Sequence, residues 1–156
     1  MGKIKPASDS RLRGKEIVKI DDGGRLKIPK RFLDIIREKF DDQVYITSVN
    51  GDCVWVYPMR RWQEIEERFR ADMPFNTKAR QFSQRTSYWG KPERIDSKGR
   101  ILLPSDLRKI AKLDNEIIVI GNVDYLEIWN KEVMDQKILN EPFDENEMLE
   151  IIYRKD

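Results

Sequence analysis

Histidine is absent from this chain of 156 residues, and cysteine occurs once, at Cys53. Histidine is the commonest general base and the commonest metal ligand, so its absence excludes Ser–His catalysis, Cys–His catalysis and His-cluster zinc sites. A single cysteine supports neither a disulfide framework nor a thiolate metal site, and the apolar run around Cys53 predicts a buried thiol. Because the spacing singles out no pair of carboxylates, we expect a protein that is not an enzyme and needs no metal or cofactor.

Long apolar runs are also missing. No stretch approaches the roughly 20 apolar residues that a membrane-spanning helix requires, and residues 1–13 lack the apolar core of a secretory signal. The scarcity of cysteine is typical of proteins from a reducing compartment. These features predict a cytoplasmic protein without a membrane partner.

Charged residues are abundant but unevenly distributed. Residues 1–40 hold 12 Lys and Arg against 6 Asp and Glu, residues 41–112 hold 14 against 10, and residues 113–156 hold 4 against 12. The last segment is therefore acidic and the rest basic, although the net charge is only +2. This polarity indicates a basic surface for a polyanion; the alternative is an ordinary solvated surface.

What the chain does contain is one motif written twice. Residues 20–29 read IDDGGRLKIP and residues 95–104 read IDSKGRILLP, so Ile, Asp, Gly, Arg and Pro return at a constant offset of 75 residues. A short helical pattern and two apolar runs follow each copy, which indicates a duplicated domain. Each half is too small to bury a large core alone, so we expect the halves to pack on each other or on further subunits.

Local patterns predict an α+β fold that is mainly β. Strands are expected at residues 15–20, 25–28, 44–48, 53–57, 93–95, 100–103, 116–120 and 125–129, and helices at 30–40, 58–73, 105–111 and after Asn130. Asp and Gly residues at 21–24 and 96–99 predict turns between strands. Asp144 is typical of the cap of a last, acidic helix, which either buries its apolar side or stays loose.

We divide the chain into a disordered leader (1–12), a first repeat (13–73), a connector (74–91), a second repeat (92–140) and an acidic tail (141–156). The connector interleaves basic residues with Phe75, Phe82, Tyr88 and Trp89. Such a pattern can stack single-stranded nucleic acid, and the alternative is that these aromatic residues dock the connector on the core.

The repeated motif resembles that of a known domain. Asp-x-x-Gly-Arg between two alternating strands, closed by apolar-x-apolar-Pro and a helix, is similar to the SpoVT/AbrB-type swapped-hairpin domain. Two copies in one chain resemble more specifically the MraZ family. Arg13-Gly14 before the first strand, Val56-Tyr57-Pro58 and Glu127-Ile128-Trp129 support this assignment, which covers roughly residues 13–138.

The resemblance implies an AbrB-like double-split β-barrel, built from two tandem repeats with short flanking helices. It also implies a sequence-specific DNA-binding transcriptional regulator of the division and cell-wall gene cluster, associated with the nucleoid. Such a protein would bind direct repeats of double-stranded DNA in a promoter as a homo-oligomer, in a ring such as an octamer.

We expect the motif and its flanks to present cations to DNA phosphates and base edges. The candidates are Lys15, Lys19, Arg25, Lys27, Lys30 and Arg31 in the first half and Arg94, Lys98 and Arg100 in the second. The resemblance favours Arg25, because the motif arginine is a functional position in the family. The alternative is that Asp21–Arg25 and Asp96–Arg100 are ion pairs that pin the turns. The residues expected to shape the backbone are Asp21, Gly24, Pro29, Asp96, Gly99 and Pro104.

A second hypothesis belongs to another functional class. The chain could be an oligomeric protein-interaction module, such as an antitoxin-like subunit, because related folds grip a protein partner with an acidic or apolar C-terminal tail. Residues 141–156 have that composition. Deleting residues 140–156 separates the two hypotheses, since DNA binding survives if the tail is accessory.

Overall fold

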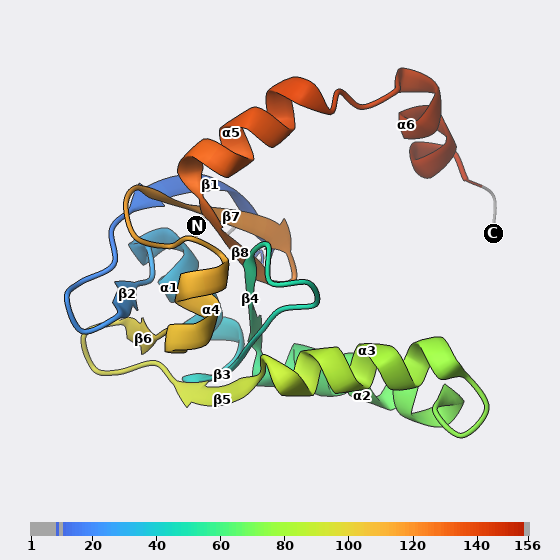
Figure 1. The fold of residues 1–156 in the computed structure, drawn as a ribbon, viewed down its shortest axis with the longest axis horizontal. Helices are drawn as coiled ribbons and strands as arrows, with labels where there is room; N and C mark the ends of the chain where they lie inside the picture. The colour runs from blue at the N-terminus through green and yellow to red at the C-terminus, as the bar shows by residue number, and fades with distance from the viewer. Residues whose placement is uncertain (1–8, 10, 155–156) are drawn as a thin grey trace, which may run out of the picture.

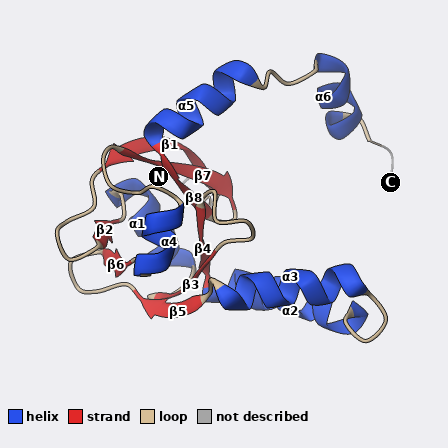
Figure 2. Ribbon diagram, viewed as in Figure 1, coloured by secondary structure: helices blue, strands red, loops and turns tan. Residues whose placement is uncertain are grey.

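The computed structural model describes residue 9 and residues 11–154 of the chain. The predicted leader therefore lies largely outside the described residues. The strands are β1 (Leu12–Val18), β2 (Arg25–Lys27), β3 (Gln43–Thr47), β4 (Val54–Pro58), β5 (Lys91–Arg94), β6 (Arg100–Leu102), β7 (Ile117–Val123) and β8 (Leu126–Asn130). The helices are α1 (Lys30–Lys39), α2 (Met59–Asp72), α3 (Thr77–Tyr88), α4 (Ser105–Ile110), α5 (Lys131–Asn140) and α6 (Glu145–Ile152). The prediction of an α+β fold is confirmed (Figure 2).

The two repeats exchange their first strands. The larger sheet has the antiparallel order β1-β7-β8-β4-β3-β5, so β1 of the first repeat pairs with β7 of the second, and β5 of the second pairs with β3 of the first. Each of these strands has a counterpart in the other repeat: β1 and β5, β3 and β7, and β4 and β8. Replacing each strand by its counterpart gives the same order, read from the opposite edge of the sheet. Neither repeat forms the larger sheet from its own strands alone, which confirms the expectation that the halves pack on each other.

A second, two-stranded sheet joins the repeated motifs. β2 and β6 pair antiparallel, with Arg25 opposite Leu102 and Lys27 opposite Arg100. Two reciprocal bonds extend this β2–β6 ladder. The Ile28 N–H donates to the Gly99 carbonyl at 2.9 Å, and the Leu103 N–H donates to the Gly24 carbonyl at 3.1 Å.

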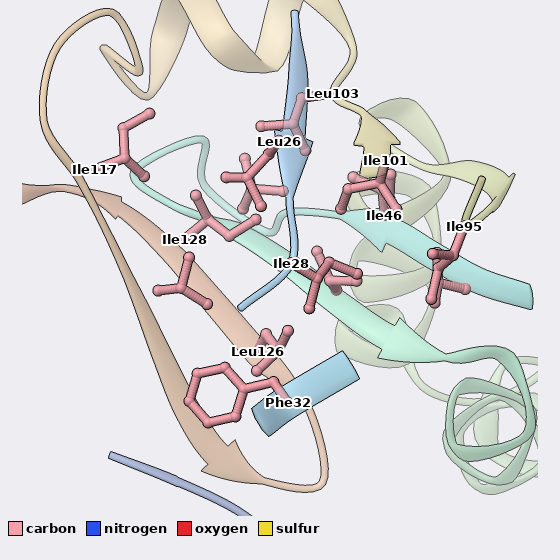
Figure 3. Packing of buried hydrophobic residues seen from close by; sticks show 14 of the residues in the cluster. Leu26, Ile28, Phe32, Ile46, Ile95, Ile101, Leu103, Ile117, Leu126 and Ile128 are labelled. Atoms are coloured by element: carbon pink, nitrogen blue, oxygen red, sulfur yellow. The ribbon is translucent and has the colours of Figure 1, made fainter. Parts of the chain in front are cut away.

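One hydrophobic core lies between the ladder, the larger sheet and the two short helices α1 and α4. Figure 3 shows side chains of both motifs meeting those of the sheet, among them Leu26 and Ile101 from the ladder and Ile46 and Ile128 from the sheet. These residues are at most 1% exposed. Burying their apolar surface is the main driving force that holds the two repeats together.

The connector between the repeats contains a helix that the sequence analysis did not anticipate. α3 is capped by Asn76, whose side chain accepts bonds from the Lys78 and Ala79 N–H groups, and it runs back along α2 as a helical hairpin (Figure 1). Phe82 packs against Trp62 and Phe69 of α2, so docking is confirmed for this aromatic residue. Phe75 and Tyr88 remain exposed.

Two helices follow the second repeat. Asn130 caps α5 as predicted, since its side chain accepts a bond from the Val133 N–H at 3.0 Å. Met134 of α5 is buried on the sheet, whereas Val133 and Ile138 are exposed, and α5 rises away from the sheet toward its C-terminal end (Figure 1). Every residue of α6 is exposed. No helix in the described part of the chain is long and apolar enough to cross a membrane.

Candidate nucleic-acid interface

The two repeated turns have the same construction. In the first, the Asp21 carboxylate accepts bonds from the N–H groups of Gly23 and Arg25, both at 2.9 Å. In the second, Asp96 accepts from Lys98 at 2.9 Å and Arg100 at 2.8 Å. The backbone bond from the arginine lowers the pKa of each carboxyl most, and so both turns carry an ionised aspartate at neutral pH.

Glycine is required at the fourth position of each turn. Gly24 has φ +82° and Gly99 has φ +78°, in the left-handed region that glycine tolerates best. Pro29 and Pro104 then directly precede α1 and α4, where the missing proline N–H leaves no helical bond unmade. Both turns lie at the same edge of the molecule, away from the α2–α3 hairpin and α6 (Figure 1).

Three candidate cations share the solvent-facing side of the ladder. Leu26 and Ile101 are buried, so their neighbours Arg25, Lys27 and Arg100 face outward, and Lys27 lies directly opposite Arg100. Like charges directly opposite each other destabilise a strand pair. Arg100 is balanced by nearby carboxylates, whereas Lys27 forms no ion pair with a described residue, so its charge on this face is left unbalanced.

The two motif arginines are held differently. Arg100 Nε donates to Asp96 Oδ2 at 2.9 Å, and Arg100 Nη1 lies 3.7 Å from Asp21 Oδ2. The Arg25 side chain forms no ion pair with any described residue. A Cβ added to Gly23 would lie only 3.0 Å from Arg25 Nη1, so the guanidinium rests over a bare glycine. The ion-pair alternative thus describes Arg100 and not Arg25.

Four further candidates surround the ladder. Lys19 and Arg94 are exposed two residues before Asp21 and Asp96, and Lys98 is exposed within the second turn; within residues 9 and 11–154, none of the three makes an ion pair. Lys30 stands at the start of α1, where its ammonium pairs with Asp34 at 2.8 Å.

Two predicted cations lie elsewhere. Arg31 covers the free edge of β1, where its guanidinium donates to the carbonyls of Arg13 and Lys15 and to Glu16 at 2.7 Å. Lys15 is on the outer face of the larger sheet, opposite Ile120 of β7. Both side chains are exposed, but neither is on the ladder.

Arg108, which was not among the predicted cations, also lies beside the first turn. Arg108 Nε donates to the Leu103 carbonyl at 3.2 Å, and its guanidinium covers Gly24 so closely that an added Cβ would lie 2.6 Å from Cζ. Its counterpart at the offset of 75 residues is Leu33, which covers Gly99 in the same way. That exchange of an apolar residue for a cation at matching positions is the signal that could have identified it.

Two further features of the described residues bear on other kinds of site. No group of three or more Cys, Asp or Glu side chains among them is arranged to hold a metal ion. Cys53 is buried, as predicted, and burial, helped by the charges of Glu127 and Asp52, raises the pKa of its thiol. A thiol with a raised pKa is a poor nucleophile at neutral pH.

Comparison with known proteins agrees with these observations. A family described as "MraZ protein, putative antitoxin-like" matches residues 12–86 and 93–147, a span that includes both turns and the ladder. Proteins named "Transcriptional regulator MraZ" are among the similar sequences. The one from Acidobacterium capsulatum is 33% identical over 127 residues, which is 81% of this chain and 87% of the relative.

Two other relatives of that name are similar over slightly shorter regions. The protein from Desulforamulus reducens is 39% identical over 75% of this chain and 80% of its own length. The protein from Moorella thermoacetica is 41% identical over 72% of this chain and 76% of its own length. The duplicated motif, the exchanged strands and these matches together establish that the chain belongs to the MraZ family.

Proposed function

We propose that this protein is a transcriptional regulator that binds double-stranded DNA through the outward face of the β2–β6 ladder. The observation that carries the proposal is the placement of Arg25, Lys27 and Arg100 together on that face. Relatives named as transcriptional regulators support the same conclusion.

The ladder suits the major groove of DNA. A two-stranded β-ribbon fits this groove, and arginine can bond the O6 and N7 atoms of guanine with two parallel hydrogen bonds. Arg25 is the principal contact in this proposal, because its guanidinium forms no salt bridge with a described carboxylate, although its charge acts on Asp21. Lys19, Lys30, Arg94 and Lys98 surround the ladder and would bind phosphates, which positions the protein without reading sequence. Lys15 and Arg31 lie off the ladder and are not principal DNA contacts in this proposal.

A single ladder is too short to read a promoter alone. Three residues per strand reach few base pairs, so we propose that a homo-oligomer, such as a ring, binds several direct repeats at once. We also propose that the strands close as an AbrB-like double-split β-barrel, because each repeat supplies its first strand to the other. The protein would then act on the nucleoid in the cytoplasm.

The test begins with selection of bound sequences from a random duplex pool by the purified protein. With about six phosphates neutralised, affinity for the selected duplex should fall by orders of magnitude between about 50 and 200 mM salt. Arg25→Glu should abolish binding and leave the oligomer size unchanged. Arg70→Glu is the matched control, since Arg70 is exposed on α2 and paired with Glu67, away from the ladder.

Two results would overturn the proposal. One is a flat response to salt, because phosphate contacts release counterions and must depend on ionic strength. The other is equal loss of binding in Arg25→Glu and Arg70→Glu. Loss of binding and of the oligomer together in Arg25→Glu would instead assign a structural role to this residue.

The second candidate function is a protein-interaction module. The exposed apolar residues of α6 favour it, as does the family description "putative antitoxin-like". A chain without residues 140–156 separates the two functions. If the shortened chain still binds DNA, the tail is accessory to DNA binding. If it binds DNA but no longer binds a protein partner, the result favours the interaction module.

A further inference from the structure

An apolar groove opens on the outer face of the larger sheet, beneath α5. It encloses about 590 Å³ and is lined by Gly14 and Lys15 of β1, Ile118 and Ile120 of β7, and Met134, Asp135, Ile138 and Leu139 of α5. Ile138 and Leu139 are 68% and 73% exposed, because α5 leaves the sheet after Met134. Apolar side chains exposed side by side in this way mark a docking surface.

α6 has the shape and composition to fill such a groove. Met148, Leu149 and Ile152 form an apolar stripe at helical spacing, and all three are exposed. Glu147 and Glu150 lie on the opposite side of the helix. A helix of eight residues is marginal in water on its own, so α6 requires a surface on which to pack. The family match ends at residue 147, before this stripe begins.

Charge matches the helix to the groove. α6 and its cap carry four acidic residues, Asp144, Glu145, Glu147 and Glu150, and neither lysine nor arginine. The groove contributes Lys15, which forms no ion pair with the described part of the chain. Asp135, the acidic lining residue, is already paired with Lys131 at 2.6 Å and so repels the helix little.

The linker favours a groove on another copy over the groove of the same chain. Glu141 precedes Pro142, which disfavours a helical backbone, and its φ of −123° and ψ of 68° agree with that restriction. Asp144 is also extended, with φ −77° and ψ 127°. These residues carry α6 beyond the end of α5 and away from the groove (Figure 1). A chain that folded α6 back would have to reverse direction within residues 141–144.

We propose that α6 of one copy docks in the α5–β1–β7 groove of a second copy, with its apolar stripe on Ile138 and Leu139 and its acidic side toward Lys15. The inference rests on the oligomer of the proposed function and names the contact that builds it. Helix and groove are different surfaces, so the contact is head-to-tail and can close into a ring.

The first test measures oligomer mass by light scattering on the full chain. Leu139→Glu and Ile152→Glu each place a charge in the contact, and both should cause loss of the oligomer at concentrations where the unchanged protein retains it. Both side chains are exposed, so the fold should survive, which circular dichroism checks. Phe75→Glu is the matched control, because Phe75 is 94% exposed at the tip of the α2–α3 hairpin. Unchanged mass in both groove and helix variants would overturn the proposal.

The second test is cross-linking between copies, for which the buried Cys53 provides a low background. A protein with Leu139→Cys is mixed with a protein with Ile152→Cys and treated with a short bis-maleimide. The proposal expects cross-linked dimers in the mixture and not in either protein alone. Cross-linking within one chain that carries both substitutions, without dimers, would place α6 in its own groove and overturn the proposal.

The outcomes also separate this inference from the DNA-binding proposal. Adding Arg25→Glu to both cysteine variants should leave their cross-linked dimers unchanged, because the ladder is remote from the groove (Figure 1). Cross-linking with no DNA binding by the unchanged protein would overturn the proposed function alone. An oligomer that survives both Leu139→Glu and Ile152→Glu and still binds the selected duplex would overturn the groove contact alone.

Discussion

Arg100 of the second repeat reaches across the duplication to Asp21 of the first, with 3.7 Å between Nη1 and Oδ2. The reverse contact, from Arg25 to Asp96, is not formed among the described residues. Two copies that share the same turn have therefore diverged at equivalent arginines. Arg100 ties the two turns together, and Arg25 makes no such ion pair with a described residue.

Arg100→Ala should lower the thermal midpoint of unfolding by a few degrees, and Arg25→Ala should leave it nearly unchanged. The reason is that Arg100 bonds Asp96 directly and also approaches Asp21, whereas Arg25 has no salt bridge to a described residue to lose. Thermal melts followed by circular dichroism measure the difference. Equal destabilisation by the two substitutions would contradict the division of roles.

Local signals predicted most of the elements. The Asp-Gly turns, the alternating strands and the Asn130 cap each depend on residues within a few positions of one another, and the structure contains all of them. Helix α3 also had a local signal, the Asn76 cap. It was missed because the aromatic and basic residues of the connector suggested a ligand-binding segment.

Strand partners could not be predicted in the same way. Alternation across residues 15–28 around a glycine turn looks like a hairpin, yet Ile20 and Leu26 form only an isolated bridge. The alternation of apolar and polar residues predicts which side chains of a strand face the core. It does not predict which other strand pairs with it. The exchange of β1 and β5 is decided by contacts about a hundred residues apart in β1 and about fifty in β5.

The candidate site was predictable in composition but not in geometry. Charge and the repeat indicated a cationic motif, and three of the nine candidate cations came together on the ladder. Arg31 could not be distinguished from them by sequence, because its role depends on the free edge of β1, which follows from the exchanged pairing. The same dependence on pairing hid Arg108.

Substitution of the turn glycines should destabilise the two turns unequally. Gly24→Ala forces a left-handed residue, at a cost of about 1–2 kcal/mol in the free energy of unfolding, but the Arg108 guanidinium it meets can swing away. Gly99→Ala adds a clash with Leu33, whose Cδ2 would lie 2.6 Å from the new Cβ in the core, so it should cost more.

Urea unfolding measures both effects, with Gly23→Ala as the control. Gly23 is not left-handed, and its added Cβ would meet the end of the Arg25 side chain at 3.0 Å and would make ordinary contact with Asp21 Oδ1 at 3.4 Å. The expected order of destabilisation is Gly99→Ala, then Gly24→Ala, then Gly23→Ala. A larger cost at Gly23 than at Gly99 would show that the packing of Leu33 on the turn does not matter for stability.

Cys53 should resist thiol reagents in the native protein. Burial raises the pKa of its thiol above the ordinary 9.0, and the adjacent charges of Glu127 and Asp52 act in the same direction. Labelling with a maleimide at pH 8 should therefore be slow until denaturant is added. Phe75→Cys supplies an exposed thiol for comparison, since Phe75 is 94% exposed. Equal native labelling rates at the two sites would contradict the burial of Cys53.

The two turns should loosen in acid. The pKa values of Asp21 and Asp96 are held below their ordinary value of 3.8, first by the backbone N–H of the arginine four residues later. A carboxyl whose pKa is lowered by folding stabilises the protein fully above its unfolded pKa, and this contribution is lost as pH falls below about 4 toward the folded pKa. The amide signals of Arg25 and Arg100 should therefore shift in NMR spectra over that acid range. A variant with Asp21→Asn and Asp96→Asn keeps an acceptor oxygen in each turn but removes the titration, so its amide signals should not shift there. The same acid shift in both proteins would assign the transition to other carboxyl groups.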